Sequence, residues 1–108
     1  MYCWKVKPGQ EEAFAAAWSQ VTRWIRTHVP GARGSVLLRS AEDPHEFVAI
    51  ARWTSRAAWE AFPGTEASEL QAHRQTMRET AERSRPAAFF EEVDDLTVSG
   101  EEERPAGV

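Results

Sequence analysis

The stretch from residue 51 to residue 74 contains three large aromatic side chains and a histidine, namely Trp53, Trp59, Phe62 and His73. Aromatic rings offer flat apolar faces that suit a planar organic ligand. An imidazole can accept a proton from such a ligand, so His73 is the candidate general base. The same rings could instead fill an ordinary core, with the histidine partly buried beside a carbonyl group. The residue types alone leave both interpretations open.

Tryptophan is unusually frequent in this chain. Its 108 residues include five, at positions 4, 18, 24, 53 and 59. A tryptophan combines a large apolar ring with an N–H group that needs a hydrogen-bond acceptor when it is buried. For any one of them, packing in the core or in a subunit interface is the simpler explanation. Five together favour a pocket for a planar, mainly apolar ligand.

Several classes of partner and site are not expected from this composition. The net charge is −4 and no stripe of lysine and arginine is present, so we expect no nucleic-acid partner. The single cysteine, Cys3, and the histidines at positions 28, 45 and 73 lack the spacing of metal ligands. No glycine-rich nucleotide motif and no apolar run of membrane-spanning length occurs. We therefore expect a cytoplasmic protein with no metal, no cofactor and no membrane partner.

The hydrophobic pattern predicts seven secondary-structure elements. The predicted strands cover residues 2–7, 33–40, 46–53 and 87–93, and the predicted helices cover 10–28, 56–62 and 66–83. The break between the last two helices falls at Pro63-Gly64. The order is β-α-β-β-α-β with an interrupted second helix. This order predicts an α+β ferredoxin-like fold, with a four-stranded antiparallel sheet and helices on one face.

The strand predicted for 46–53 is apolar on both faces. Residues 47, 49, 51 and 53 share one face, whereas Val48 and Ile50 lie on the other. A chain with so few helices cannot cover both faces of its sheet. We therefore predict a homodimer formed through the uncovered face. Residues 1–98 are assigned to one domain, and the acidic tail, 99–108, is expected to be disordered.

Three segments, in order, carry a resemblance to a known family: "VKPGQEEAF", "PGARGSVLLRSAEDPHEFVAIARWTSRAAWEAF" and "LQAHR". Together they resemble the antibiotic biosynthesis monooxygenase (ABM) domain, over a stretch that runs from residue 4 to residue 93. The resemblance implies a ferredoxin-like homodimer whose sheets pack face to face. It also implies a pocket between the sheet and the helices of each subunit.

Some members of this family oxidise aromatic polyketides or quinols with O₂, without a metal or flavin, and the resemblance implies this function here. A deprotonated phenol or anthrone can donate an electron directly to O₂. In this interpretation His73 accepts the proton, and Trp53, Trp59 and Phe62 form the walls around a small aromatic substrate. Replacing His73 by Ala would then lower turnover roughly 10²-fold or more.

Two other functions stay open at this point. The same pocket could serve a non-oxidative enzyme or a module that binds a small ligand. A third branch of the family binds and degrades haem, with an asparagine, a tryptophan and a histidine. Only the histidine has a counterpart here, at His73, whereas Phe62 stands at the tryptophan position and Tyr2 near the asparagine. The haem-degrading branch is therefore the weaker match.

Overall fold

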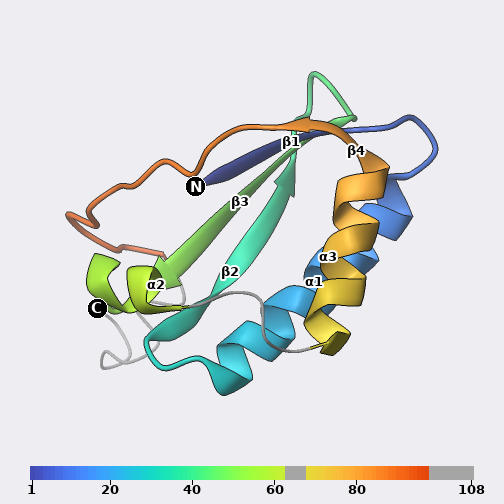
Figure 1. The fold of residues 1–108 in the computed structure, drawn as a ribbon. Helices are drawn as coiled ribbons and strands as arrows, with labels where there is room; N and C mark the ends of the chain where they lie inside the picture. The colour runs from blue at the N-terminus through green and yellow to red at the C-terminus, as the bar shows by residue number, and fades with distance from the viewer. Residues whose placement is uncertain (63–67, 98–108) are drawn as a thin grey trace.

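The computed structural model describes residues 1–62 and 68–97, and its elements follow the predicted order, with different bounds near the C-terminal end (Figure 1). The strands are β1 (Tyr2–Val6), β2 (Ala32–Arg39), β3 (Glu46–Trp53) and β4 (Ala81–Ser84). The helices are α1 (Glu11–His28), α2 (Arg56–Ala61) and α3 (Ser68–Thr80). The predicted break at Pro63-Gly64 and the predicted tail, 99–108, lie outside the described residues.

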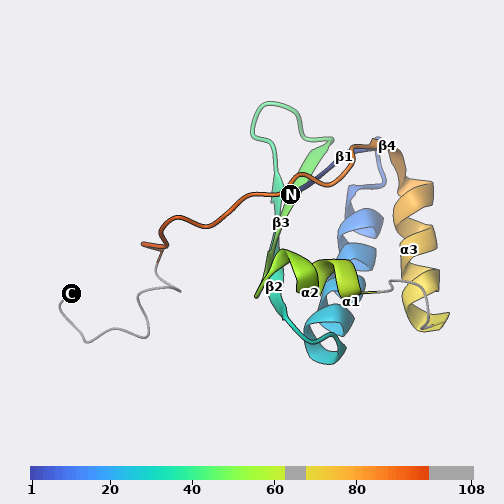
Figure 2. The same ribbon diagram turned by 60° about the vertical axis from the view of Figure 1, so that its left-hand side comes forward.

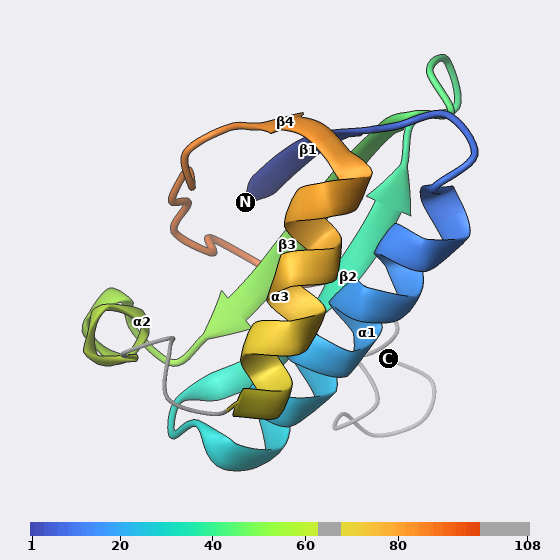
Figure 3. The same ribbon diagram turned by 45° about the vertical axis from the view of Figure 1, so that its right-hand side comes forward.

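The four strands form one antiparallel sheet in the order β2-β3-β1-β4. The long helices α1 and α3 lie side by side on one face of this sheet (Figures 2 and 3). No helix of the described residues covers the other face (Figure 2). The predicted ferredoxin-like architecture is therefore confirmed, with α2 as a short additional helix between β3 and α3.

A cluster of buried apolar residues lies where α1 begins. Val6 and Phe14 are fully buried, and Phe47 is nearly so. The Phe14 ring centroid lies 5.1 Å from that of Trp4 and 5.6 Å from that of Phe47, which is a favourable separation for aromatic pairs. Helical spacing puts the buried Val21 on the same side of α1 as Phe14, so this helix faces the sheet along its length.

Strand β2 begins with an irregular segment. Its register against β3 shifts between Ala32 and Ser35. Gly34, between them, has a φ of +94°, a left-handed conformation that glycine adopts easily. A shift of this kind is typical of a β-bulge, which bends a strand and increases its twist.

The prediction for the last strand was wrong. The sequence pattern favoured helix as far as residue 83 and a strand over 87–93, but α3 ends at Thr80 and β4 follows at once. The Thr80 hydroxyl donates to the carbonyl oxygen of Thr76 at 2.8 Å in the last helical turn. The next residue, Ala81, already pairs with Val6 of β1. Pairing with the free edge of β1 overrides the helical propensity of the residues that follow Thr80.

The open face of the sheet, which we define as the face opposite α1 and α3, has an apolar centre. Val36, Leu38 and Ile50 are exposed there to 48%, 46% and 44%, and Val36 stands directly opposite Ile50. On the other side of β3, Phe47 and Ala49 are buried beneath the helices. The apolar residues on one face of β3 are thus buried by the helices, whereas Ile50 on the other face is exposed in the single chain.

Candidate active site

A cavity of about 470 Å³ lies between the sheet and the helices, at the end of the sheet where β3 gives way to α2. Its volume is in the range of small-molecule binding pockets. The aromatic side chains in its walls are Tyr2, Trp4, Trp18, Trp53, Trp59 and Phe62. The structure therefore brings together all three aromatic residues predicted for the site. We call this space the aromatic cavity.

Helix α2 carries Trp59, which lines the cavity. Two hydrogen bonds and a close approach to Gly31 hold the helix in place. The Ser55 hydroxyl accepts a hydrogen bond from the Ala58 N–H at 3.1 Å, as an N-cap does. The Thr54 N–H donates to the Gly31 carbonyl oxygen at 2.8 Å. Gly31 has a φ of +86°, and a Cβ at this position would lie only 2.6 Å from the Ala58 Cβ. The turn after α1 can approach α2 this closely because residue 31 is glycine.

A hydrogen bond joins two of the cavity residues across the sheet and α2. The Trp59 Nε1–H donates to the Tyr2 hydroxyl oxygen at 2.7 Å, and both side chains are half-buried. A hydroxyl that accepts one hydrogen bond becomes a better donor in the next. Tyr2 was not among the site residues predicted from the sequence. Tyr2 and Trp4 share one face of β1, and this spacing was the signal that could have placed Tyr2 on the cavity side.

Four residues with charged side chains also line the aromatic cavity. They are Arg26, Arg52, Arg74 and Glu60. The Glu60 carboxylate accepts a hydrogen bond from the Arg56 Nε–H at 3.1 Å. The Arg74 guanidinium lies over the Phe62 ring, 5.6 Å from its centroid, which is a favourable cation–π distance. The lining thus combines aromatic faces with the charged groups of Arg26, Arg74 and Glu60. Arg52 lies on the same face of β3 as Ile50, so its guanidinium points away from the helices.

Residues 85–97 form what we call the C-terminal arm, which leaves β4 and passes α2. The Ala88 N–H donates to the Met1 carbonyl oxygen at 3.0 Å, beside β1. The Phe89 ring then meets the Trp59 ring edge-on at 4.7 Å between centroids. The Arg56 guanidinium lies over the Phe89 ring, 4.2 Å from its centroid. The arm therefore packs against Trp59, which lines the aromatic cavity.

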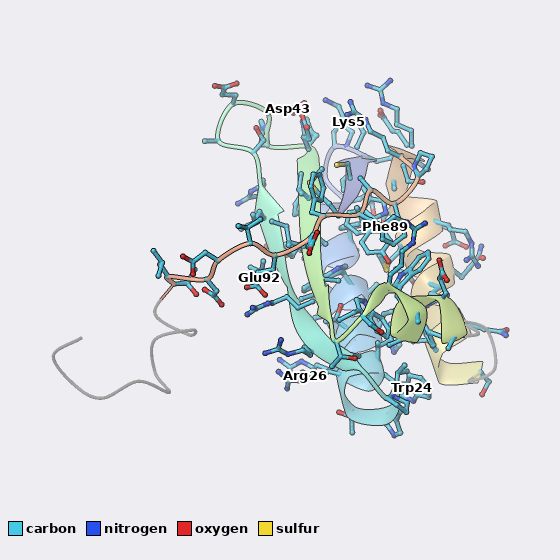
Figure 4. The ribbon with its side chains drawn as sticks, turned by 90° about the vertical axis from the view of Figure 1, so that its left-hand side faces the viewer. Lys5, Trp24, Arg26, Asp43, Phe89 and Glu92 are labelled. Carbon is cyan, nitrogen blue, oxygen red and sulfur yellow. The ribbon has the colours of Figure 1, made fainter. Side chains whose placement is uncertain are left out.

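Further along, the arm is held by Arg52 of β3. The Arg52 Nη2–H group donates to Glu92 at 2.6 Å and to Asp95 at 3.0 Å. The hydrogen bond with Glu92 is the main cause that raises the pKa of Arg52 above its ordinary value. Hydrogen bonds from Thr97 are the main cause that lowers the pKa of Asp95. Figure 4 shows Phe89 on the α2 side of the sheet and Glu92 on the opposite side, so the arm crosses the sheet end.

His73 does not line the aromatic cavity. It is half-buried on α3 and borders a second cavity of about 240 Å³, together with Leu70 and with Trp24 of α1. Trp24 stacks on His28 at 4.5 Å between ring centroids. Like His73, Trp24 does not line the aromatic cavity. The structure leaves His73 apart from the three predicted aromatic residues. Its role as the base stays a prediction.

Within residues 1–62 and 68–97, no group of three or more His, Cys, Asp and Glu residues is placed to hold a metal ion. No helix there has the length and apolar character that crossing a membrane requires. The residues of this part of the chain that line the aromatic cavity carry hydroxyl, indole N–H, carboxylate and guanidinium groups.

Solved structures of several bacterial proteins share this fold. A Nitrosomonas europaea protein that bears the name antibiotic biosynthesis monooxygenase is 25% identical, with a TM-score of 0.64 over 78% of this chain and 79% of that one. A variant of SnoaB, a cofactor-independent oxygenase from Streptomyces nogalater, is 23% identical, with a TM-score of 0.66 over 88% and 91%. Rv0793 from Mycobacterium tuberculosis is 22% identical, with a TM-score of 0.64 over 86% and 94%.

The sequence itself matches a family model. Among curated proteins no match is found. The family model described as antibiotic biosynthesis monooxygenase matches residues 3–80, which extend from β1 to the end of α3. This span includes most of the chain and most of the residues that line the aromatic cavity. The chain therefore belongs to the antibiotic biosynthesis monooxygenase family.

Proposed function

We propose that this chain is a cofactor-independent monooxygenase that oxidises a small aromatic compound, of the polyketide or quinol type, with O₂. The observation that carries the proposal is the aromatic cavity, because six aromatic side chains around about 470 Å³ offer faces on which a planar substrate can stack. Membership of the family and the shared fold with SnoaB support monooxygenase chemistry on this scaffold.

In the proposed reaction, a phenol or anthrone loses a proton and the resulting anion transfers one electron to O₂. The substrate radical and superoxide combine to a peroxide. Loss of water from the peroxide leaves a carbonyl group, so that one oxygen atom enters the substrate and the other leaves as water. The Tyr2 hydroxyl would donate a hydrogen bond to the substrate oxygen and stabilise its negative charge. The aromatic walls would keep water away from the anion.

Two residues are candidates for the proton acceptor. His73 is the base predicted from the sequence, and Glu60 is the carboxylate that lines the cavity. The geometry favours Glu60, because His73 borders the other cavity. We expect Glu60→Gln to lower turnover at least roughly tenfold and His73→Ala to remain near the wild-type rate. The reverse result would establish His73 as the base.

Oxygen uptake by purified, chelator-treated protein over a panel of hydroquinones and anthrones tests the proposal. Uptake above the uncatalysed rate, with a carbonyl product that contains one oxygen atom from ¹⁸O₂, is the expected result. Saturable binding of the same compounds without any uptake would contradict the proposed oxidation. That outcome would indicate a binding module or a non-oxidative enzyme that uses the same cavity.

We further propose that the chain forms a homodimer through the open face of its sheet. Contiguous exposed apolar surface is typical of subunit interfaces, and Val36, Leu38 and Ile50 provide such a surface. The C-terminal arm, which carries the exposed Phe90 and Val93, extends on the same side of the sheet (Figure 2). A second copy packed against this face would cover the apolar side chains of both the sheet and the arm.

A further inference from the structure

The aromatic cavity is lined by a cationic residue that has no partner among the described residues. Three arginines and one glutamate line this cavity. Arg52 is paired with acids of the C-terminal arm, and Arg74 lies over Phe62 and has further contacts. Within residues 1–62 and 68–97, Arg26 is the cavity cation that has neither an ion pair nor a side-chain hydrogen bond with the protein. A guanidinium in this position is available for an anionic ligand.

Arg26 lies in the last turn of α1, close to the bulged start of β2. A Cβ built on Gly34 would lie 3.4 Å from the Arg26 Cδ. The arginine stem therefore lies close to the β2 backbone at residue 34. Arg26 is exposed although it lines the cavity. Its guanidinium consequently belongs to the mouth of the cavity, where it also meets water.

We propose that Arg26 makes the cavity selective for planar aromatic ligands that carry a carboxylate, with the rings between the tryptophans and the carboxylate at the mouth. The inference rests on the proposed function, because it takes the cavity as the site of an aromatic substrate. A guanidinium pairs with a carboxylate through two parallel N–H···O bonds. A carboxylate at the mouth keeps part of its hydration, whereas burial among the rings would cost that hydration. The hydroxyl groups of Thr22 and Ser35 also line the cavity and can donate to a carboxylate.

The test is a binding measurement that requires no turnover. Its probes are anthracene-2-carboxylate and anthracene-2-carboxamide, which have nearly the same shape and differ in charge. Quenching of tryptophan fluorescence reports binding, because four of the five tryptophans line the cavity. We expect the wild-type protein to bind the carboxylate roughly tenfold more tightly than the amide. Arg26→Gln should abolish this preference, because the carboxylate loses the charged partner that distinguishes it from the amide.

Arg33→Gln is the matched control. It removes the same charge from an exposed position on β2 that does not line the cavity, and it should keep the tenfold preference. If Arg26→Gln does not fold, Arg26→Met replaces it, because methionine keeps an unbranched stem and a good helical propensity but has no charge. A wild-type preference in Arg26→Met would then overturn the inference.

The outcomes separate this inference from the proposed function. Equal affinity of the wild-type protein for the two probes, or an unchanged preference in Arg26→Gln, would overturn the role of Arg26. The aromatic cavity and the proposed oxidation would still stand in that case. Failure of both probes to bind would overturn the inference and also remove the support that the cavity gives to the proposed function.

Discussion

At the scale of single residues, the hydrogen bond from Trp59 to Tyr2 is a polar contact within an otherwise aromatic wall. Tyr2→Phe keeps the ring and removes the hydroxyl, so a substrate oxygen would lose its hydrogen-bond donor. We expect kcat/KM for an oxidised aromatic substrate to fall roughly tenfold. Trp24→Phe, outside the aromatic cavity, is the control. An equal loss of kcat/KM in both variants would indicate that general destabilisation, and not the missing hydroxyl, causes the effect.

A second residue-scale prediction concerns the contact between Lys5 of β1 and Asp43 of the β2–β3 hairpin, which Figure 4 shows at the same end of the molecule. The hydrogen bond from Lys5 is the main cause that lowers the pKa of Asp43 from its ordinary value of 3.8, followed by the backbone N–H of His45. The ionised carboxylate is therefore bound more favourably in the folded state. Its contribution to stability is present above pH 3.8 and is lost as the pH falls through the lower folded-state pKa.

Asp43→Asn should accordingly lower the midpoint of thermal unfolding at neutral pH. The difference from the wild-type protein should shrink as the pH falls below 3.8. Glu42→Gln removes a neighbouring exposed carboxylate and should have little effect at any pH. Thermal unfolding followed by circular dichroism over the acid range measures both variants. A difference that persists undiminished in acid would contradict the role of the Asp43 charge.

At the scale of elements, the position of α2 depends on Gly31. Gly31→Ala would place a non-glycine residue at a φ of +86° and a Cβ 2.6 Å from that of Ala58. Left-handed backbone and overpacking together should cost about 2–5 kcal/mol. Gly9→Ala is the matched control, because its φ is +82° but nothing lies within 4 Å of the added Cβ. It should cost only about 1–2 kcal/mol.

Chemical denaturation of the two glycine variants gives the free energies of unfolding. Equal losses would mean that the contact between Gly31 and Ala58 relaxes without cost. A larger loss for Gly31→Ala, accompanied by weaker binding of aromatic probes, would link this turn to the placement of Trp59.

The elements differ in how far their sequence determines them. Helix α1 was predicted within one residue, because its apolar stripe, its acidic first turn and its basic last turn all agree. Strand β3 was predicted at both ends, and its two-sided pattern correctly indicated an uncovered face. The boundary between α3 and β4 was missed, because residues 81–83 have good helical propensity and become a strand only through pairing with β1.

The site was predictable in part for a similar reason. Trp53, Trp59 and Phe62 follow one another near the end of β3, so their proximity is local and visible in the sequence. His73 lies on the apolar side of α3, but periodicity does not say whether such a residue faces the sheet or the neighbouring helix. It faces the cavity that Trp24 of α1 borders. The contribution of Arg26 depends on the approach of α1 to Gly34, which is a tertiary contact that no local pattern encodes.

At the scale of the whole molecule, the proposed homodimer should have twice the 12.2 kDa mass of the chain. Ile50→Lys places a charge in the centre of the open face, where the monomer tolerates it because Ile50 is already 44% exposed. We expect light scattering to show a dimer for the wild-type protein and a monomer for Ile50→Lys. Ala16→Lys, at an exposed position of α1, should remain dimeric. A wild-type mass of a single chain would overturn the proposal.

The bulge around Gly34 also protects the outer edge of the sheet. Strand β2 is an edge strand, and the unpaired N–H and C=O groups of an edge strand can recruit a strand from another molecule and start aggregation. A bulge twists the strand away from the flat geometry that such recruitment needs. Arg33 and Arg39 add positive charges to the same strand. Fibril growth by strand addition at this edge is thereby disfavoured.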